Sequence, residues 1–149
     1  MNIPKKTLVI LMADDDADDR LLAQDAMHES RVLNELHFVE DGVQLLRYLR
    51  GDDEFADRTL HPMPGLILLD LNMPKMDGRE ALAEIKSDPR LRRIPVVILT
   101  TSKAEEDMFK GYDLGAASYI TKPVTFDALV ELMRTLGKYW VEFVELPYE

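Results

Sequence analysis

The sequence predicts an α/β domain built as a doubly wound, five-stranded parallel sheet with helices on both faces. Five short apolar runs of strand length alternate with segments of helical periodicity. Three of these runs are apolar almost throughout, as is typical of parallel strands covered on both faces. Successive strand–helix units imply right-handed crossovers, and we expect the strand order 2-1-3-4-5.

The expected strands are bounded by turn residues or by the starts of helices. They are Thr7–Met12, Leu36–Val39, Gly65–Asp70, Pro95–Thr100 and Ser118–Thr121.

Between the strands, apolar residues recur at spacings of three and four, which indicates helices with one buried face. These sets are Leu21, Leu22, Ala26 and Met27; Val43, Leu46 and Leu49; Ala81, Leu82 and Ile85; and Leu129, Leu132, Met133 and Leu136. Asp77 to Glu80 and Ser102 to Glu105 have the spacing of a capping box, and the last helix is expected to begin near Thr125. The segment 51–64 reads as one long surface loop.

Composition limits the possible functions. The chain has 149 residues and a formal net charge of -10, which fits one domain and disfavours a nucleic-acid partner. It contains no Cys, so there is no disulfide framework and no thiolate metal site. No apolar run reaches the roughly 20 residues that span a bilayer, and no signal peptide is evident. We therefore expect a cytoplasmic protein without a membrane partner.

Polar residues follow the ends of four predicted strands. Asp14 and Asp15 follow the first strand, Asp70 ends the third, Thr100 ends the fourth and Lys122 follows the fifth. In an open parallel sheet these carboxyl ends meet at one edge, where ligands bind. Three carboxylates, a hydroxyl and an ammonium are thus predicted to form one site.

Three adjacent carboxylates repel one another when all are ionised, and a cation among them relieves that repulsion. Because the expected ligands are oxygens, without His or Cys, the cation should be Mg²⁺, with Mn²⁺ as a possibility. A carboxylate beside such an ion can attack a phosphoryl group. Asp70, isolated at the end of a buried strand, is the best candidate nucleophile, while Asp14 and Asp15 are better suited to hold metal. Lys122 and Thr100 would stabilise the charge that develops on the phosphoryl group.

These residues occur in motifs that resemble a known family. The acidic pair after the first strand, LLDLNMPKMDG (residues 68–78), VVILTTS (96–102) and YITKP (119–123) have the order and spacing of the receiver domain of two-component response regulators. The resemblance covers nearly the whole chain. It implies the flavodoxin-like strand order, and a protein that accepts phosphate for signalling rather than an enzyme with external substrates.

The resemblance also implies roles for individual residues. Asp70 would accept a phosphoryl group from a histidine kinase or a phosphotransfer protein. Asp15, Asp70 and the backbone carbonyl of Asn72 would bind Mg²⁺, and Asp14 would hold a metal-bound water. In this family Lys122 would contact the phosphoryl group.

Two further implications concern the end of the sheet. Thr100 and Tyr119 would form the pair that switches conformation on phosphorylation, although a tyrosine in a strand is often simply part of the core. The peptide bond between Lys122 and Pro123 is usually cis in this family.

The loop before LILLDLNMP, the TTS run and the end YWVEFVELP (139–147) are similar to stand-alone regulators paired with bacterial phytochromes. We expect a single receiver domain over residues 1–149, with a helical extension or tail at 137–149 and no output domain. The apolar stripe continues through Tyr139, Trp140, Phe143 and Val144. An exposed aromatic patch usually marks an interface, so we expect a homodimer built on the last helix and the tail. The alternative is a tail that folds back over its own domain.

Other readings of the acidic run remain open. Asp16, Asp18 and Asp19 can simply be solvated at a helix N-terminus, where anions are stabilised. Asp14, Asp16 and Asp18 also match positions 1, 3 and 5 of a calcium loop, but its sixth position is Asp19 rather than Gly and its twelfth is Asp25 rather than Glu.

Two rival functional classes also remain. An aspartyl-nucleophile phosphatase would carry a second aspartate two residues after Asp70, where this chain has Asn72, which cannot supply a proton. A pseudo-receiver that is never phosphorylated is the other rival, and the presence of all five site residues argues against it.

Overall fold

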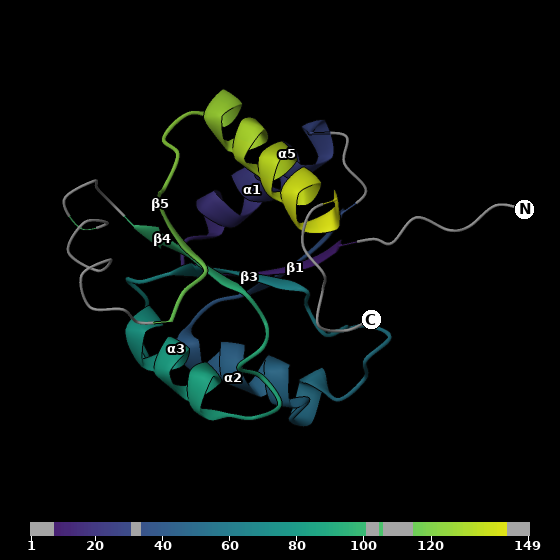
Figure 1. Ribbon diagram of the computed structural model, residues 1–149, viewed down its shortest axis with the longest axis vertical. Helices are drawn as coiled ribbons and strands as arrows, with labels where there is room; N and C mark the ends of the chain where they lie inside the picture. Colours follow the sequence, from purple (N-terminus) through teal and green to yellow (C-terminus); the bar gives the residue numbers. More distant parts are fainter. Residues whose placement is uncertain (1–7, 31–33, 101–104, 106–114, 143–149) are drawn as a thin grey trace, which may run out of the picture.

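The computed structural model describes residues 8–30, 34–100, 105 and 115–142, with the side chains of residues 34 and 137–142 left outside the description. Figure 1 shows a sheet between two layers of helices. The strands are β1 (Leu8–Ala13), β2 (Asn34–Val39), β3 (Leu66–Asp70), β4 (Val96–Thr100) and β5 (Ser118–Thr121). The helices are α1 (Ala17–Glu29), α2 (Gly42–Arg50), α3 (Gly78–Ser87), α5 (Phe126–Glu142) and the short 3₁₀ helix η1 (Asp53–Phe55).

All strand pairs are parallel, and the order is β2-β1-β3-β4-β5, as the sequence predicts. The predicted strand boundaries agree with the structure to within two residues wherever the structure describes them. Strand β1 lies between β2 and β3, so the direction of chain progression across the sheet reverses beside it. This reversal places the end of β1 next to the end of β3, at the position where open α/β sheets bind ligands.

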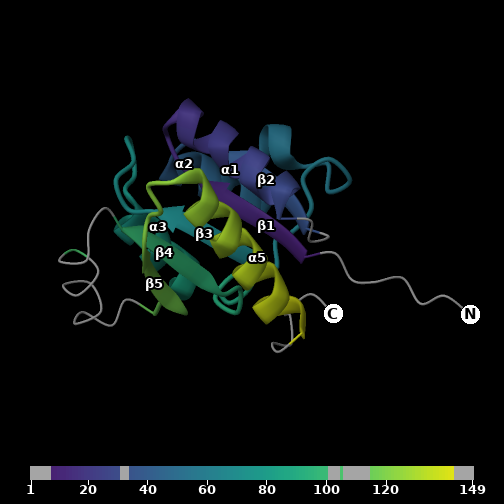
Figure 2. The ribbon, with the colours of Figure 1, turned by 90° about the horizontal axis from the view of Figure 1, so that it is seen from above.

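Helices α1 and α5 cover one face of the sheet, and α2 and α3 cover the other (Figures 1 and 2). Alternate residues of each central strand enter two separate cores, because successive side chains of a strand point to opposite faces. The core under α2 and α3 takes Leu11, Ile67, Leu69, Val96 and Ile98. The core under α1 and α5 takes Ile10, Met12, Leu66, Leu68, Val97 and Leu99.

The predicted apolar stripe of α3 is confirmed, since Ala81, Leu82 and Ile85 are fully buried. Asp77 caps this helix by accepting a hydrogen bond from the backbone N–H of Glu80 at 3.0 Å. The other predicted capping box, at Ser102, lies outside the described residues.

The predicted face of α1 is partly wrong. Leu21 is 60% exposed and Leu22 is 45% exposed, whereas Ala23, Ala26 and Met27 are buried. The apolar periodicity of this segment fits two neighbouring faces. Small alanine side chains allow α1 to pack closely beside α5, and this packing turns the two leucines outward.

The last helix begins where predicted. The hydroxyl of Thr125 accepts a hydrogen bond from the backbone N–H of Ala128 at 3.1 Å, and α5 follows from Phe126. Val130, Met133 and Leu136 are buried against the sheet, with Leu129 and Leu132 packed at the margin.

The long loop after α2 lies at the surface as expected, but it is held by specific contacts. Phe55 of η1 is buried beside Tyr48. The guanidinium of Arg58 donates to the backbone carbonyls of Tyr48, Leu49 and His61 at 2.8 to 3.2 Å. The Tyr48 and Leu49 carbonyls lie in the last turn of α2, so Arg58 adds hydrogen-bond donors at this end of the helix.

Among the described residues no peptide bond is cis, so the Lys122–Pro123 bond is trans. The expectation of a cis bond is therefore wrong for this structure. The trans isomer is the intrinsically favoured one, by about 0.5–1 kcal/mol before proline.

Candidate functional site

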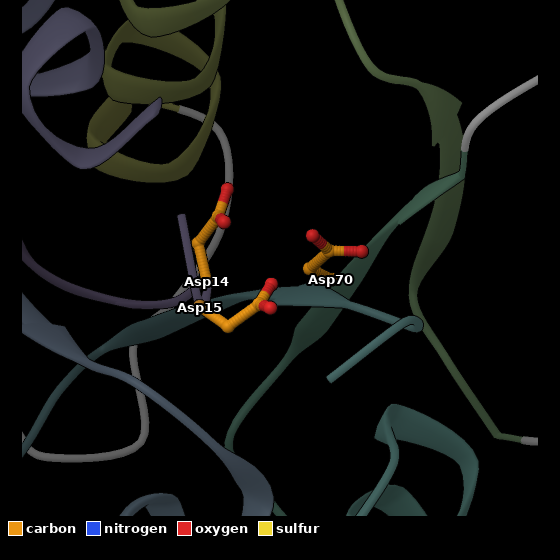
Figure 3. Close-up of side chains that lie close together, drawn as sticks. All are labelled: Asp14, Asp15 and Asp70. Carbon is orange, nitrogen blue, oxygen red and sulfur yellow. The ribbon is translucent and has the colours of Figure 1, made fainter. Parts of the chain in front are cut away.

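The three predicted carboxylates meet at the carboxyl edge of the sheet. Figure 3 shows the side chains of Asp14 and Asp15 at the end of β1 and that of Asp70 at the end of β3. The Asp15 carboxylate points toward Asp70, while the Asp14 side chain turns toward the layer of α1 and α5. One oxygen from each carboxylate lies within 4.8 Å of the others.

Strand alternation explains these directions. Asp14 continues the Ile10–Met12 side of β1, and Asp70 continues the Leu66–Leu68 side of β3, so both side chains project toward the α1 and α5 face. Asp14 is fully buried and Asp70 is 6% exposed, whereas Asp15, one residue beyond Asp14, is exposed.

Backbone and side-chain contacts fix the Asp14 carboxylate. Its backbone N–H donates to the Val39 carbonyl at 3.1 Å, which extends the pairing of β1 with β2. Its Oδ1 accepts from the backbone N–H of Asp16 at 2.9 Å, and its own carbonyl accepts from the Arg20 guanidinium at 2.8 Å. The buried anion is thus positioned by the turn that starts α1.

Lys122, in the loop before α5, makes contacts with residues at the ends of β1, β3 and β4. Its Nζ lies 2.7 Å from Asp14 Oδ2, 3.3 Å from Asp70 Oδ2 and 2.6 Å from Asp19 Oδ2. Its backbone N–H donates to the Thr100 carbonyl at 2.7 Å, which ties this loop to the end of β4. The ammonium therefore has a carboxylate partner for each of its three N–H donors.

The pKa values of the two central groups are shifted by burial and by each other. Burial raises the pKa of Asp70 above its ordinary value, and the nearby Asp14 charge adds to this, while the Lys122 ammonium and the Asn72 N–H oppose it. Burial would lower the pKa of Lys122, but hydrogen bonds to Asp14 and Asp19 and the charge of Asp70 outweigh it, so the net shift is upward. Lys122 therefore stays charged, and Asp70 is held in an environment that penalises its negative charge.

The loop between β3 and α3 wraps closely around Asp70. Its Oδ1 accepts from the backbone N–H of Asn72 at 3.1 Å, and the Gly78 N–H donates to the Leu71 carbonyl at 2.9 Å. A Cβ atom on Gly78 would lie 2.7 Å from the Asp70 carbonyl oxygen, which is too close for real atoms. Only glycine allows the start of α3 to approach the end of β3 in this way.

Thr100 and Tyr119 lie on the opposite face. Thr100 is 1% exposed and its hydroxyl donates to the Ile120 carbonyl at 3.4 Å. Tyr119 pairs in register with Ile98, two residues before Thr100, so both side chains project from the α2 and α3 face of neighbouring strands. The half-buried Tyr119 ring packs against that core.

The three carboxylates of Asp14, Asp15 and Asp70 offer the oxygen donors that Mg²⁺ and Mn²⁺ prefer. A divalent cation among Asp14, Asp15 and Asp70 would also relieve the repulsion that burial intensifies. The residues present therefore fit the predicted metal ion.

Among the described residues no helix is both long and apolar enough to span a membrane.

Sequence reasoning missed the role of Asp19. The simplest expectation placed Asp16, Asp18 and Asp19 in solvent at the start of α1. Asp16 does cap α1 through the N–H groups of Asp18 and Asp19, and Asp18 is exposed, but Asp19 pairs with Lys122. The pair joins residues more than 100 positions apart, so no local spacing in the sequence could have indicated it.

Comparison with known proteins agrees with this geometry. Residues 10–134 match the family described as the response regulator receiver domain. The chain belongs to that family. Receiver domains of this family accept a phosphoryl group on an aspartate from histidine kinases or phosphotransfer proteins and bind Mg²⁺.

Individual relatives of this receiver domain match over almost the full chain. Response regulator Rcp1 of Synechocystis sp. is 42% identical over 146 residues, which cover 98% of this chain and 95% of Rcp1. The crystal structure of the phosphorylated cyanobacterial phytochrome response regulator RcpA has a TM-score of 0.82 and 44% identity, and the match covers 95% of this chain and 99% of that one. The Mn²⁺-bound form of Rcp1 has a TM-score of 0.77 and 41% identity, with 94% and 99% covered.

Proposed function

We propose that Asp70 is the phosphoacceptor of this receiver domain. It is the carboxylate at the end of the central strand β3, and it faces the Lys122 ammonium across 3.3 Å. This contact carries the proposal, because it pairs a nucleophile with a cation able to meet the charge of an incoming phosphoryl group.

The reaction transfers a phosphoryl group from a phosphohistidine. A carboxylate oxygen of Asp70 forms a bond to phosphorus while the bond between phosphorus and the donor imidazole nitrogen breaks. The nitrogen keeps the bonding electron pair and takes up a proton, and Asp70 becomes an acyl phosphate. Lys122 holds a phosphoryl oxygen, and the Asn72 N–H keeps the carboxylate oriented for attack.

Asp14, Asp15, Asp70 and the backbone carbonyl of Asn72 are the proposed metal-binding groups. Asp14 is assigned the indirect role of holding a metal-bound water, since its carboxylate is buried and accepts a hydrogen bond from the Lys122 ammonium at 2.7 Å. A bound Mg²⁺ would supply positive charge that stabilises the incoming phosphoryl group.

Thr100 and Tyr119 are the proposed switch pair. They project from the same face of adjacent strands, and the Thr100 carbonyl accepts a hydrogen bond from the backbone N–H of Lys122. A phosphoryl group adds about -1.5 to -2 of charge beside these strand ends. The Thr100 hydroxyl would leave the Ile120 carbonyl for a phosphoryl oxygen, and the Tyr119 ring would move into the space that becomes available.

We assign the chain to signalling rather than to turnover of external substrates. Asn72 stands where aspartyl phosphatases carry their general acid, and an amide cannot donate a proton in that role. RcpA is a cyanobacterial phytochrome response regulator, and the similarity to it supports a bacterial phytochrome as the kinase. The single receiver domain over residues 1–149, the tail at 137–149 and a cytoplasmic location stay predictions.

A homodimer built on α5 is the proposed assembly. Helix α5 has 17 residues and is about 25 Å long, whereas the five residues of β4 span about 16 Å. Its last turns therefore extend past the strands that bury its first turns. Tyr139 and Trp140 fall in this part of the helix, and their side chains, like Phe143 and Val144, lie outside the described residues.

The phosphoacceptor is tested by Asp70→Asn. The change is nearly isosteric and removes the nucleophile, so labelling by acetyl phosphate in the presence of Mg²⁺ should disappear while the circular dichroism spectrum is retained. Asp18→Asn serves as the matched control, because it removes an exposed carboxylate of the same acidic run. Labelling that survives in Asp70→Asn would move the phosphoacceptor to another residue, and wild-type protein that is never labelled would favour a pseudo-receiver.

A further inference from the structure

The ion pair between Asp19 and Lys122 is not explained by the metal site or by the proposed phosphoacceptor. Asp19 lies in the first turn of α1, and Lys122 lies in the loop between β5 and α5. Their 2.6 Å contact is the shortest that the Lys122 ammonium makes with the three carboxylates around it. Asp19 does not belong to the group of three carboxylates that could share a metal ion.

We infer that Asp19 competes with the phosphoryl group for Lys122 and so limits how tightly the phosphorylated site holds that group. The inference rests on the proposed function, in which Lys122 contacts a phosphoryl group on Asp70. In this arrangement Asp19 is a positioning residue that acts through the lysine.

The donor count of Lys122 supports the competition. An ammonium has three N–H donors, and Asp14, Asp19 and Asp70 each provide an acceptor within 3.3 Å. A phosphoryl group presents several strong acceptor oxygens and more negative charge than the carboxylate it replaces. To bind more than one of these oxygens, Lys122 has to give up another carboxylate.

Burial decides which carboxylate is released. Asp14 is fully buried, so losing its ammonium partner would leave an uncompensated charge in the interior. The side chain of Asp19 is 34% exposed and can be hydrated when the lysine leaves. A cavity of about 50 Å³ beside the pair, lined by Asp19, Lys122, Thr125 and Phe126 among others, has room for water. Asp19 is therefore the partner that yields.

The charge of Asp19 opposes the phosphoryl group in a second way. Its carboxylate contacts the same ammonium as Asp70 does, and like charges repel strongly in a partly dehydrated site. Removal of that charge leaves Lys122 still held by Asp14 at 2.7 Å, so the ammonium keeps its place beside Asp70. The net effect of neutralising Asp19 is stronger retention of the phosphoryl group.

The test compares Asp19→Asn with Asp18→Asn in the full chain. Both variants remove one negative charge from the first turn of α1. Asp19 contacts Lys122, whereas Asp18 is exposed and makes no ion pair with that lysine among the described residues. Beryllofluoride, an analogue of the phosphoryl group, is titrated calorimetrically at saturating Mg²⁺, and Mg²⁺ is titrated separately. Asp19→Asn should bind beryllofluoride about tenfold more tightly than Asp18→Asn, and its aspartyl phosphate should hydrolyse more slowly.

Two further readouts separate competition from a general change of charge or fold. The affinity for Mg²⁺ should be the same in both variants, because Asp19 is not one of the metal-binding carboxylates. Asp19→Glu keeps the charge, and its beryllofluoride affinity should remain close to that of the wild type.

Equal beryllofluoride affinity in Asp19→Asn and Asp18→Asn, or weaker binding in Asp19→Asn, would overturn the inference and leave the phosphoacceptor assignment intact. Wild-type protein that binds no beryllofluoride and takes no phosphoryl group would instead overturn the proposed function, and the inference with it.

Discussion

At the scale of single residues, the site gathers negative charge that the protein can neutralise only in part. Lys122 contacts Asp14 and Asp70, but the exposed Asp15 carboxylate lies within 4.8 Å of both and adds repulsion. Such crowding is tolerated because a divalent cation is expected among the three groups. The repulsion among the three carboxylates lowers the stability of the metal-free protein, and the same three charges allow the protein to bind a doubly charged ion.

Asp15→Ala tests whether the crowded carboxylates favour Mg²⁺ binding and destabilise the metal-free protein. The variant should bind Mg²⁺ at least about tenfold more weakly and be phosphorylated more slowly, because one metal ligand is lost. In EDTA it should be as stable as the wild type or more stable, by about 1 kcal/mol at most, because one repelling charge has gone. Urea unfolding in EDTA and calorimetric Mg²⁺ titration give the two quantities. A clear loss of stability in EDTA would contradict the crowding argument.

Tyr48 provides a test at alkaline pH. Its hydroxyl donates to the Pro62 carbonyl at 2.9 Å, and burial raises the pKa of Tyr48 from 10.0 to about 12, with Arg58 opposing and Glu35 adding to the shift. The folded protein therefore keeps the neutral phenol at a pH where the unfolded chain ionises it. The contribution of Tyr48 to stability is fully present below pH 10 and is lost as the pH rises from about 10 to about 12.

Tyr48→Phe should remove that dependence. Below about pH 9.5 the variant should be less stable than the wild type by about 1 kcal/mol, because the hydrogen bond to Pro62 is lost. Above about pH 10 the difference between their unfolding free energies should shrink, since only the wild type has this phenol to ionise on unfolding. Urea unfolding at a series of pH values measures the difference, and a constant difference up to pH 11 would refute the assignment.

At the scale of elements, helix ends set the position of the reactive groups. The turn that starts α1 holds Asp14 through the Asp16 N–H, and the start of α3 presses against the end of β3 at Gly78. Gly42, at the start of α2, makes a similar approach, because a Cβ there would lie 2.4 Å from the Met76 carbonyl oxygen. The loop that carries Asn72 is thus confined from two sides.

Gly78→Ala should disturb this arrangement. The added methyl group would overlap the backbone of Asp70 and Leu71, so α3 or the end of β3 must shift, at a cost of typically 1–3 kcal/mol. Because the shift occurs at Asp70, Mg²⁺ affinity and the rate of phosphorylation should fall as well.

The exposed Ala83 of α3 offers the matched control, since Ala83→Gly should cost about 1 kcal/mol of helix propensity without changing Mg²⁺ affinity. Equal Mg²⁺ affinity in Gly78→Ala and the wild type would show that the close approach at Gly78 does not position the site.

At the scale of the whole molecule, the two faces of the sheet have different parts in the proposed switch. Lys122, Asp14 and Asp70 meet on the α1 and α5 face, while Thr100 and Tyr119 project from the opposite face. A phosphoryl group at the shared edge can therefore act on both layers. The long helix α5 belongs to the layer that contains the Asp19–Lys122 pair, and it is the element on which we propose dimerisation.

Truncation after Gly137 tests the assembly. The full chain should sediment as a dimer at about 50 μM, and the truncated chain, which keeps Val130, Met133 and Leu136 in the core, should sediment as a monomer. Matching far-UV circular dichroism would show that the shorter chain still folds. Two monomers would exclude dimerisation at this concentration, and two dimers would move the interface away from the tail.

The sequence by itself determined the class of the fold and predicted which five groups lie at one edge of the sheet. Apolar runs and helical periodicity are local properties of the chain, and they specify strands and helices directly. Parallel strands carry their carboxyl ends to one edge, so Asp14, Asp15, Asp70, Thr100 and Lys122 could be assigned to a common site before any contact was known.

Tertiary structure decided the features that depend on the rotation of an element or on contacts between distant segments. Whether Leu22 or Ala23 faced inward depended on the packing of α1 against α5, because the periodicity fitted both. The pairing of Asp19 with Lys122 joins residues more than 100 positions apart, and a local pattern carries no information about such a pair. The hydrogen bonds from Arg58 to the carbonyls at the end of α2 likewise join two segments of the chain. Composition and periodicity determine what each segment can form, and only the packed chain determines which side chains meet.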